Sequence, residues 1–551
     1  MMIANQARTC TLPVMIFVLG LALLAASCQR SSETDPPTLT GIISDADGQP
    51  LPGVLVRIQG EASGLSLLTN SQSNGHYATP ALLPDSYLVQ AFGDRFQSEV
   101  SGPVTVAVGH RSTYDLSLIA PRSVYPEPEP MELSDYFPLM PEGEGRQLVS
   151  TRCVLCHHLD RVVPTRHDRA TWAKSVDRMR SFFNSRSDLQ REFHLPPISE
   201  TERDVMLQYL SANFHADVSP MPANNPETSP LQHLPGGFAA EGGENFVVVE
   251  FTPPGGMIEN EIGIDKEGNA WITEGDTDRF GRFDPASLTY TRLTAPPGKY
   301  PRVLSQISID PAGDVWILDN GPTPDAILLR YNPATEDFRE YELKAPPGLR
   351  APVNTILFLD GFVWGTGNAS SRVIRLDPDT GEIAEYPAPL GSHPYGIAIG
   401  SDGAIWYTGN YDNAIVRIDP DSGETSTFKA RRGSGIRRMD GDAAGNMWVG
   451  AQDSNQLIKL DIRTGEITTY EVPTENSGPY AVDIDTTRNL VWFTERDGDR
   501  IGRFNPETET FVEFPLVRAG TEPRRIYVDP VNPNRVWWGC SKGGFGYVEV
   551  F

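Results

Sequence analysis

Two cysteines and a histidine stand close together in the tract Cys153-Val154-Leu155-Cys156-His157. Two thiols at this spacing can each add to one vinyl group of a porphyrin, and a histidine directly after them can bind the iron as proximal ligand. The tract therefore predicts one covalent haem c, held by Cys153, Cys156 and His157. Redox dithiols and zinc sites also use this spacing. No second cysteine pair completes a zinc site, so the remaining alternatives are a redox dithiol and a chance occurrence of this spacing.

A haem iron of this type takes a sixth ligand, and a methionine there raises the haem potential while a second histidine lowers it. We expect Met179 to be that ligand, because the tract Trp172…Arg178-Met179 is similar to one in other short cytochromes. The alternative role for Met179 is packing in a helix core. The other candidate ligands are His158, His167, His194, Met206 and Met221.

The first thirty residues have the order of a secretory signal, with Arg8, an apolar run over 12–26 and small residues before Cys28. This order resembles the lipobox of bacterial lipoproteins, although Ala25 stands where that family usually has leucine. The resemblance implies a tether over 28–38 and a lipid on Cys28 that holds the protein to a membrane on the periplasmic or cell-surface side. An ordinary cleaved signal is the alternative.

The chain has 551 residues and a net charge of −26, from 72 acidic and 46 basic residues. The length predicts three or four domains. The charge argues against a nucleic-acid partner, since binding a polyanion needs clustered cations. Of five cysteines, Cys540 has neither a role nor a partner in these predictions, so we expect no structural disulfide and a buried, inert thiol there.

Short alternating strands with turn signals fill residues 39–120 and predict a small β-sandwich. The tracts TGIISDADGQPLPGVLVRIQG and TNSQSNGHYATPALLPDSYLVQAFG resemble the carboxypeptidase regulatory-like domain. That family implies a transthyretin-like fold without catalytic residues, and hence a spacer or docking role. A Pro/Glu-rich linker is predicted over 121–141.

Residues 142–218 read as a small, mainly helical domain. Helices are predicted over 145–151, over 171–183 and from Ser199, where Ser199-Glu200-Thr201-Glu202 is a start signal. The tract TWAKSVDRM…ISETERDVMLQYLSANF resembles single-haem class I cytochromes c, which implies an all-α fold. A second linker is predicted over 219–243.

Seven tryptophans recur at a nearly constant spacing in the C-terminal part of the chain. They are Trp271, Trp316, Trp364, Trp406, Trp448, Trp492 and Trp537, separated by 45, 48, 42, 42, 44 and 45 residues. A repeat of this length with four strands per unit predicts a seven-bladed β-propeller over 244–551. The last unit stops after three strands, so we expect the segment 246–252 to complete it and close the ring.

The tracts IWYTGN with IVRIDP, and VWFTE with RIGRF, resemble the virginiamycin B (streptogramin) lyase family over about 244–551. The resemblance implies a histidine base, an acidic residue and magnesium, with Glu495 at the position of the acid. Tyr395 and Tyr480 stand where the family's histidine is expected. Since neutral tyrosine is a poor base near pH 7, this departure argues against lyase activity. The sequence leaves open whether the propeller holds Mg or Ca.

Alignment of the blades on their tryptophans also predicts which residues line one mouth of the central channel. The positions that start the innermost strands are Asn260, Ser305, Asn354, Tyr395, Arg437, Tyr480 and Arg524, and we expect the acids Glu274 and Glu495 nearby. Two arginines at the mouth of an acidic protein would bind a carboxylate or phosphate. The alternative is that they pair with those acids and close the channel.

The sequence is consistent with three functions. The leading one is an exported haem c electron-transfer protein with a ligand- or substrate-binding propeller, served by a redox partner protein or a small-molecule donor. If it is an enzyme, an oxidoreductase is favoured over a lyase. The second is a recognition protein with haem as an accessory, and the third is a C–O lyase of the streptogramin lyase type.

Overall fold

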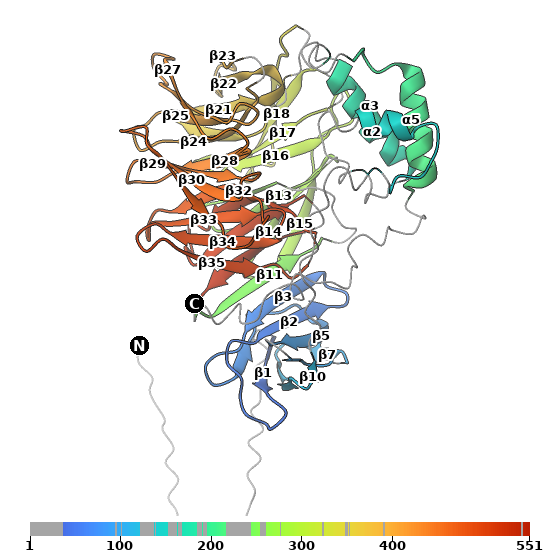
Figure 1. Cartoon of the computed structure of the whole chain (residues 1–551), viewed down its shortest axis with the longest axis vertical. Coiled ribbons are helices and arrows are strands. Elements are labelled where there is room, and N and C mark those ends of the chain that lie inside the picture. The colour runs from blue at the N-terminus through green and yellow to red at the C-terminus, as the bar shows by residue number, and fades with distance from the viewer. Residues whose placement is uncertain are drawn as a thin grey trace, which may run out of the picture.

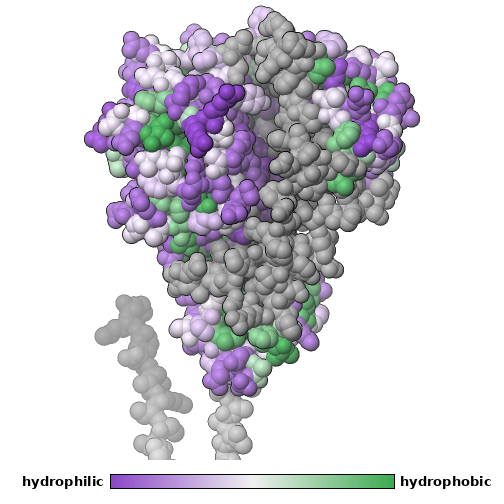
Figure 2. All heavy atoms as spheres, in the orientation of Figure 1, coloured by the Kyte–Doolittle hydropathy of each residue, from purple (hydrophilic) through white to green (hydrophobic). Residues whose placement is uncertain are grey.

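The computed structural model of the chain shows an N-terminal β-sandwich, a group of helices and a β-propeller (Figure 1). It describes residues 37–93, 96–100, 102–121, 137, 139–152, 162, 168–184, 190, 195–215, 244–253, 261–275, 277–321, 324–347, 351, 353–389, 392–518, 520–541 and 544–551. Polar residues cover most of the coloured surface on the face shown in Figure 2. None of the helices in these ranges is long and apolar enough to cross a membrane.

The sandwich has two sheets, as its alternating strands predicted. One contains β1 (Thr38–Ser44), β4 (His76–Ala78), β8 (Arg111–Thr113) and β9 (Leu116–Ser117). The other contains β2 (Leu55–Gly60), β3 (Leu65–Asn70), β5 (Asp85–Phe92), β6 (Phe96–Gln97), β7 (Val104–Val106) and β10 (Ala120–Pro121). Buried side chains such as Leu39, Val56 and Tyr87 fill the space between them.

The described residues of the second region contain three helices: α2 (Arg146–Arg152), α3 (Arg169–Asn184) and α5 (Glu200–Asn213). The Ser199 hydroxyl accepts the N–H of Glu202, whose carboxylate accepts the N–H of Ser199. This capping box confirms the predicted start of α5. The stripe on α3 also faces a core as predicted, since Trp172 and its neighbours pack against α5.

Seven four-stranded blades make up the propeller in the described ranges. Blade 1 is β12 (Ile262–Ile264), β13 (Ala270–Glu274), β14 (Arg279–Asp284) and β15 (Thr289–Thr294); blade 2 is β16 (Leu304–Ile309), β17 (Val315–Asp319), β18 (Ala326–Tyr331) and β19 (Phe338–Leu343). Blade 3 is β20 (Ile356–Leu359), β21 (Phe362–Gly367), β22 (Arg372–Leu376) and β23 (Ile383–Pro387); blade 4 is β24 (Pro394–Ile399), β25 (Ile405–Gly409), β26 (Ala414–Ile418) and β27 (Thr425–Lys429). Blade 5 is β28 (Ile436–Gly441), β29 (Asn446–Ala451), β30 (Gln456–Asp461) and β31 (Ile467–Glu471); blade 6 is β32 (Pro479–Asp485), β33 (Leu490–Glu495), β34 (Arg500–Asn505) and β35 (Thr510–Pro515).

Blade 7 closes the ring as predicted. It consists of β36 (Pro523–Val528), β37 (Arg535–Cys540), β38 (Phe545–Val550) and, from the N-terminal side, β11 (Phe246–Phe251). Strand β11 pairs antiparallel with β38, from Phe246 opposite Val550 to Phe251 opposite Phe545. The seven periodic tryptophans are buried in the blades. Their period is therefore the period of the blade core.

The sandwich and the propeller share one sheet, which the sequence did not reveal. The free edge of β11 pairs antiparallel with β3, from Val247 opposite Thr69 to Phe251 opposite Leu65. The order β10-β6-β5-β2-β3-β11-β38-β37-β36 therefore runs without a break from the sandwich into blade 7 (Figure 1). Leu68 is fully buried at this junction, in one cluster with Phe246 and Trp538.

Candidate functional site

The innermost strands of the blades have a common register. In each blade one residue of the innermost strand lies opposite the blade tryptophan; in chain order these residues are Gly263, Ser308, Leu357, Ala398, Asp440, Asp483 and Tyr527. Two positions earlier come Glu261, Gln306, Thr355, Gly396, Arg438, Ala481 and Arg525. Because side chains two apart in a strand lie on the same face, the two sets form two levels of the channel, and all their charged groups lie in blades 1, 5, 6 and 7.

An irregularity opens several of these strands at the channel mouth. The register shifts between Leu304 and Ile307 and at the equivalent point of blades 4, 5, 6 and 7. The predicted mouth residues Ser305, Tyr395, Arg437, Tyr480 and Arg524 all lie within these shifts. Bulges of this kind redirect side chains. Asn354 lies just before β20, and Asn260 lies outside the described residues.

Two tyrosines bridge the channel mouth. The hydroxyls of Tyr395 in blade 4 and Tyr480 in blade 6 hydrogen bond to each other past blade 5. The guanidinium of Arg438 lies 5.8 Å from the ring centre of Tyr395. Those of Arg437 and Arg496 lie 5.9 and 5.8 Å from the ring centre of Tyr480. Of the residues that the sequence placed at the mouth, the structure thus brings together Tyr395, Tyr480 and Arg437, and it adds Arg438 and Arg496.

These cations change the acidity of the bridge. Burial raises the pKa of Tyr395, but the positive charges of Arg524 and Arg438 outweigh it and lower that pKa to about 8. Burial and the neighbouring Tyr395 raise the pKa of Tyr480. The two phenols therefore divide their roles, with Tyr395 as the more acidic one and Tyr480 as its hydrogen-bond partner. The ring of His393 stacks on that of Tyr411, with 4.3 Å between the ring centres.

The acid that the arginines share is Glu261, which the sequence reasoning missed. Both carboxylate oxygens of Glu261 accept hydrogen bonds from Arg438, at 2.8 and 3.1 Å. Arg524 and Arg525 approach the same carboxylate at 3.4 and 3.7 Å. Burial alone would raise the pKa of Glu261, but Arg438, Arg524 and Arg525 lower it to about 2. Glu261 is thus the buried anion of this cluster.

The two acids expected at the mouth lie elsewhere. Glu274 is buried at the end of β13, where it accepts hydrogen bonds from Tyr290 and Arg292 on the outermost strand of blade 1. Glu495 is fully buried at the end of β33 and interacts with Glu513 on β35. Burial and the charge of Glu513 raise the pKa of Glu495 well above its usual range. Both acids thus face the outer strands of their blades and not the arginine cluster.

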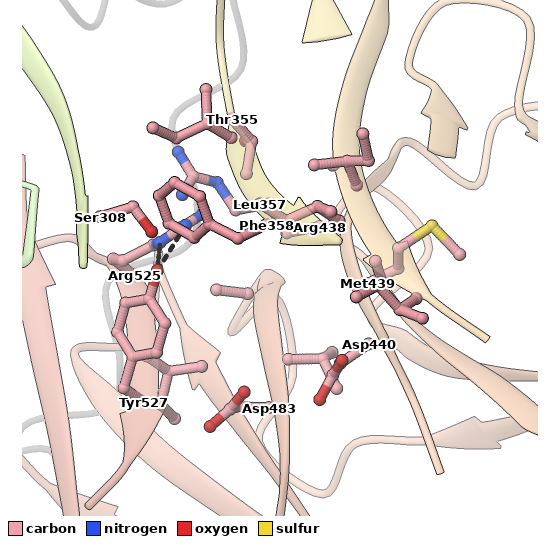
Figure 3. A pocket seen from close by; sticks show the side chains of 18 residues that line it. Ser308, Thr355, Leu357, Phe358, Arg438, Met439, Asp440, Asp483, Arg525 and Tyr527 are labelled. Carbon is pink, nitrogen blue, oxygen red and sulfur yellow. Dashed lines mark hydrogen bonds between the residues drawn. The ribbon is translucent and has the colours of Figure 1, made fainter. Parts of the chain in front are cut away.

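Below the tyrosine bridge the channel contains a cavity of about 260 Å³. Figure 3 shows its polar side chains, with Arg438 and Arg525 on one side and Asp440 and Asp483 on another. Arg525 donates hydrogen bonds to the Tyr527 hydroxyl at 2.6 and 3.0 Å. No group of three or more His, Cys, Asp or Glu side chains that could hold a metal ion occurs in the described part of the chain.

Met179, the expected distal haem ligand, is partly buried on α3 and packs against the core of the helical region. The other predicted haem and lipid residues, Cys28, Cys153, Cys156 and His157, lie outside the described residues. Cys540 is buried as expected, and its thiol donates a hydrogen bond to the Gly544 carbonyl at 2.7 Å.

Two family models match the chain, one over the sandwich and one over the propeller. Residues 38–119 match the carboxypeptidase regulatory-like domain. Two solved structures, selenomethionine-substituted virginiamycin B lyase from Staphylococcus aureus and a catalytically inactive variant of that lyase with quinupristin, are each 25% identical, with a TM-score of 0.49 over 56% of this chain and 100% of theirs. A streptogramin B lyase structure matches with the same identity and TM-score over 56% of this chain and 98% of its own. A search of curated proteins found no match. The model of the virginiamycin B lyase family matches residues 256–546, more than half of the chain, and the protein belongs to that family.

Proposed function

We propose that the protein is an exported, lipid-anchored haem c electron carrier whose propeller binds the molecule or partner with which it exchanges electrons. The propeller's family supports a ligand-binding module. The observation that carries the haem proposal is the Cys153-x-x-Cys156-His157 tract directly after the end of α2. A lipid on Cys28 and a periplasmic or cell-surface location follow from the signal-like N-terminus.

The described helices are suited to hold such a tract. Arg152, the last residue of α2, is buried and donates hydrogen bonds to the Pro196 carbonyl at 3.1 Å and to Glu202 at 2.6 Å. Gly145, just before α2, lies so close to α5 that an added Cβ would come within 2.3 Å of the Tyr209 Cβ. Close packing thus fixes the start of α2, and a partly buried ion pair fixes its end, from which the cysteines follow.

In this proposal Cys153 and Cys156 form the thioether links, His157 is the proximal ligand and Met179 the distal one. The haem would supply one-electron exchange. The partly buried position of Met179 in the helical core supports this assignment, because its side chain lies among the apolar residues of α3 and α5. The alternative for Met179 remains packing alone.

The test is a reduced-minus-oxidised absorption spectrum of full-length protein produced with the haem-maturation machinery. We expect covalent haem that is lost in Cys153→Ser but retained in Cys540→Ser, which removes a buried thiol far along the chain. Met179→Ala should remove the methionine-to-iron charge-transfer band and leave the haem attached. A wild-type protein without covalent haem would refute the electron-carrier proposal.

One observation favours a second candidate, a magnesium-dependent C–O lyase. Glu495 is fully buried in blade 6, and the carboxyl group of Glu513 lies beside it. Two carboxylates of this kind are suitable ligands for a hard cation, so Glu495 and Glu513 would hold it. The expected general base is missing in this candidate, because Tyr395 and Tyr480 replace the histidine of the family. Metal-dependent ring opening of a streptogramin that survives Cys153→Ser would support this candidate.

A further inference from the structure

The cavity in the propeller channel has two ends of opposite character. Arg438 on β28 and Arg525 on β36 lie at one level of the channel. Asp440 on β28 and Asp483 on β32 lie at the other level, which is two residues further along each innermost strand. Two residues of extended chain span about 6.6 Å. Apolar side chains, including those of Leu357, Phe358 and Met439, also line the cavity (Figure 3).

At the cationic end, the arginines outnumber the carboxylates among the described groups. Arg438 and Arg525 share one carboxylate, that of Glu261, at 2.8 and 3.7 Å. The Nε atom of Arg438 is buried without a hydrogen-bond partner among the described atoms, although only 3% of this side chain is exposed. A buried guanidinium is stable when it is both paired and fully hydrogen bonded. A second carboxylate, brought by a ligand, would meet this need.

At the acidic end, the carboxyl groups of Asp440 and Asp483 accept hydrogen bonds and have raised pKa values. Asp440 accepts the N–H of Ile484 at 3.1 Å, and Asp483 accepts the N–H of Val528 at 2.6 Å. The two carboxyl groups interact with each other. Burial raises the pKa of Asp440 to about 6, and burial together with Asp440 raises that of Asp483 well above its usual range. This end therefore suits a hydroxyl or an ammonium group of a ligand.

We propose that the cavity binds a small carboxylic acid that also carries an amino or hydroxyl group, with its carboxylate at Arg438 and Arg525 and the second group at Asp440 and Asp483. The volume of about 260 Å³ admits a short carbon skeleton and excludes a large cyclic peptide. The inference names the ligand class of the propeller and so rests on the ligand-binding role proposed above.

The test is calorimetric titration of the full-length protein with lactate, alanine, propionate and lactamide. Lactate or alanine should bind with saturation; propionate, which lacks the second group, should bind more weakly, and lactamide, which lacks the carboxylate, should not bind. Arg525→Gln should lower the affinity at least about tenfold, which corresponds to about 1.4 kcal/mol. The control Arg330→Gln, at a partly buried arginine paired with Asp314 in blade 2, should leave it unchanged.

The pH dependence distinguishes the two kinds of second group. As Asp440 ionises near pH 6, the acidic end gains negative charge, so alanine should bind more tightly above that pH. The affinity for lactate should not rise there. An affinity that rises above pH 6 for alanine but not for lactate supports this placement of the second group, and a rise for lactate would contradict it.

Two outcomes would overturn the inference: no saturable binding of any of the four compounds, or unchanged binding by a folded Arg525→Gln protein. Equal affinity for lactate, alanine and propionate would refute the role of the acidic end. The absorption spectrum of the same sample separates this inference from the electron-carrier proposal. Haem without binding refutes the inference alone, and binding without haem refutes the electron carrier alone.

Discussion

Replacing Asp440 by asparagine should stabilise the propeller at neutral pH. In the folded protein, burial raises the pKa of this carboxyl from 3.8 to about 6. The folded state therefore holds an extra proton between about pH 4 and pH 6, and its stability falls as the pH rises through this window. A shift of about two pKa units corresponds to roughly 3 kcal/mol at neutral pH. Because Asp483 shares the proton, this penalty belongs to the pair.

Asp440→Asn removes the ionisation and keeps the essential contacts. The amide oxygen can still accept the N–H of Ile484, and the amide nitrogen can donate to Asp483. Calorimetric unfolding of wild type and variant from pH 4 to pH 7 tests the prediction. The gain in the free energy of unfolding of Asp440→Asn over the wild type should be absent near pH 4 and approach its full value above pH 6. The exposed Asp421→Asn is the control, and a gain independent of pH, or a loss at pH 7, would refute the reasoning.

Three further perturbations test other parts of the structure. The tyrosinate absorption of the wild type should rise near pH 8, because the arginines lower the pKa of Tyr395. This rise should be absent in Tyr395→Phe. Tyrosine titration of the wild type only near pH 10 would contradict the lowered pKa. Glu261→Gln should cost about 3–5 kcal/mol in urea unfolding, because it leaves the buried charge of Arg438 without its anion; a loss no larger than that of the exposed Glu267→Gln would contradict this. Leu68→Ala should cost about 2–5 kcal/mol and speed proteolysis between sandwich and propeller, whereas Ile42→Ala, at a more exposed position, should do neither.

The propeller could be predicted because its signals are local and repeated. In five blades the indole of the tryptophan donates to an aspartate four to eight residues earlier, as Trp271 does to Asp265 and Trp537 to Asp529. The same turn and strand pattern therefore recurs in these five blades. The pairing of β11 with β38 was also predictable, since the last blade lacked a strand. The pairing of β11 with β3 was not, because a second free edge leaves no mark in the sequence.

The channel site was only partly predictable. Tyr395, Arg437, Tyr480 and Arg524 were found by aligning the blades on their tryptophans, and all four lie at the register shifts of their strands. Glu261 and Arg438 are 177 residues apart and meet across the ring, so no spacing connects them. Glu274 and Glu495 occupy the expected positions in their strands, but a count of residues does not say that their side chains turn toward the outer strands. The direction of a side chain depends on the twist of the blade and on the bulges at the mouth.

The junction between β3 and β11 also bears on the order in which the chain is made. The strand that completes the ring, β11, must wait for β38, which lies some three hundred residues later in the sequence. Strand β3 is synthesised before β11 and pairs with its other edge. During synthesis the sandwich can therefore act as a template that holds this apolar strand in its final register, so that it does not remain an aggregation-prone edge until the last blade emerges.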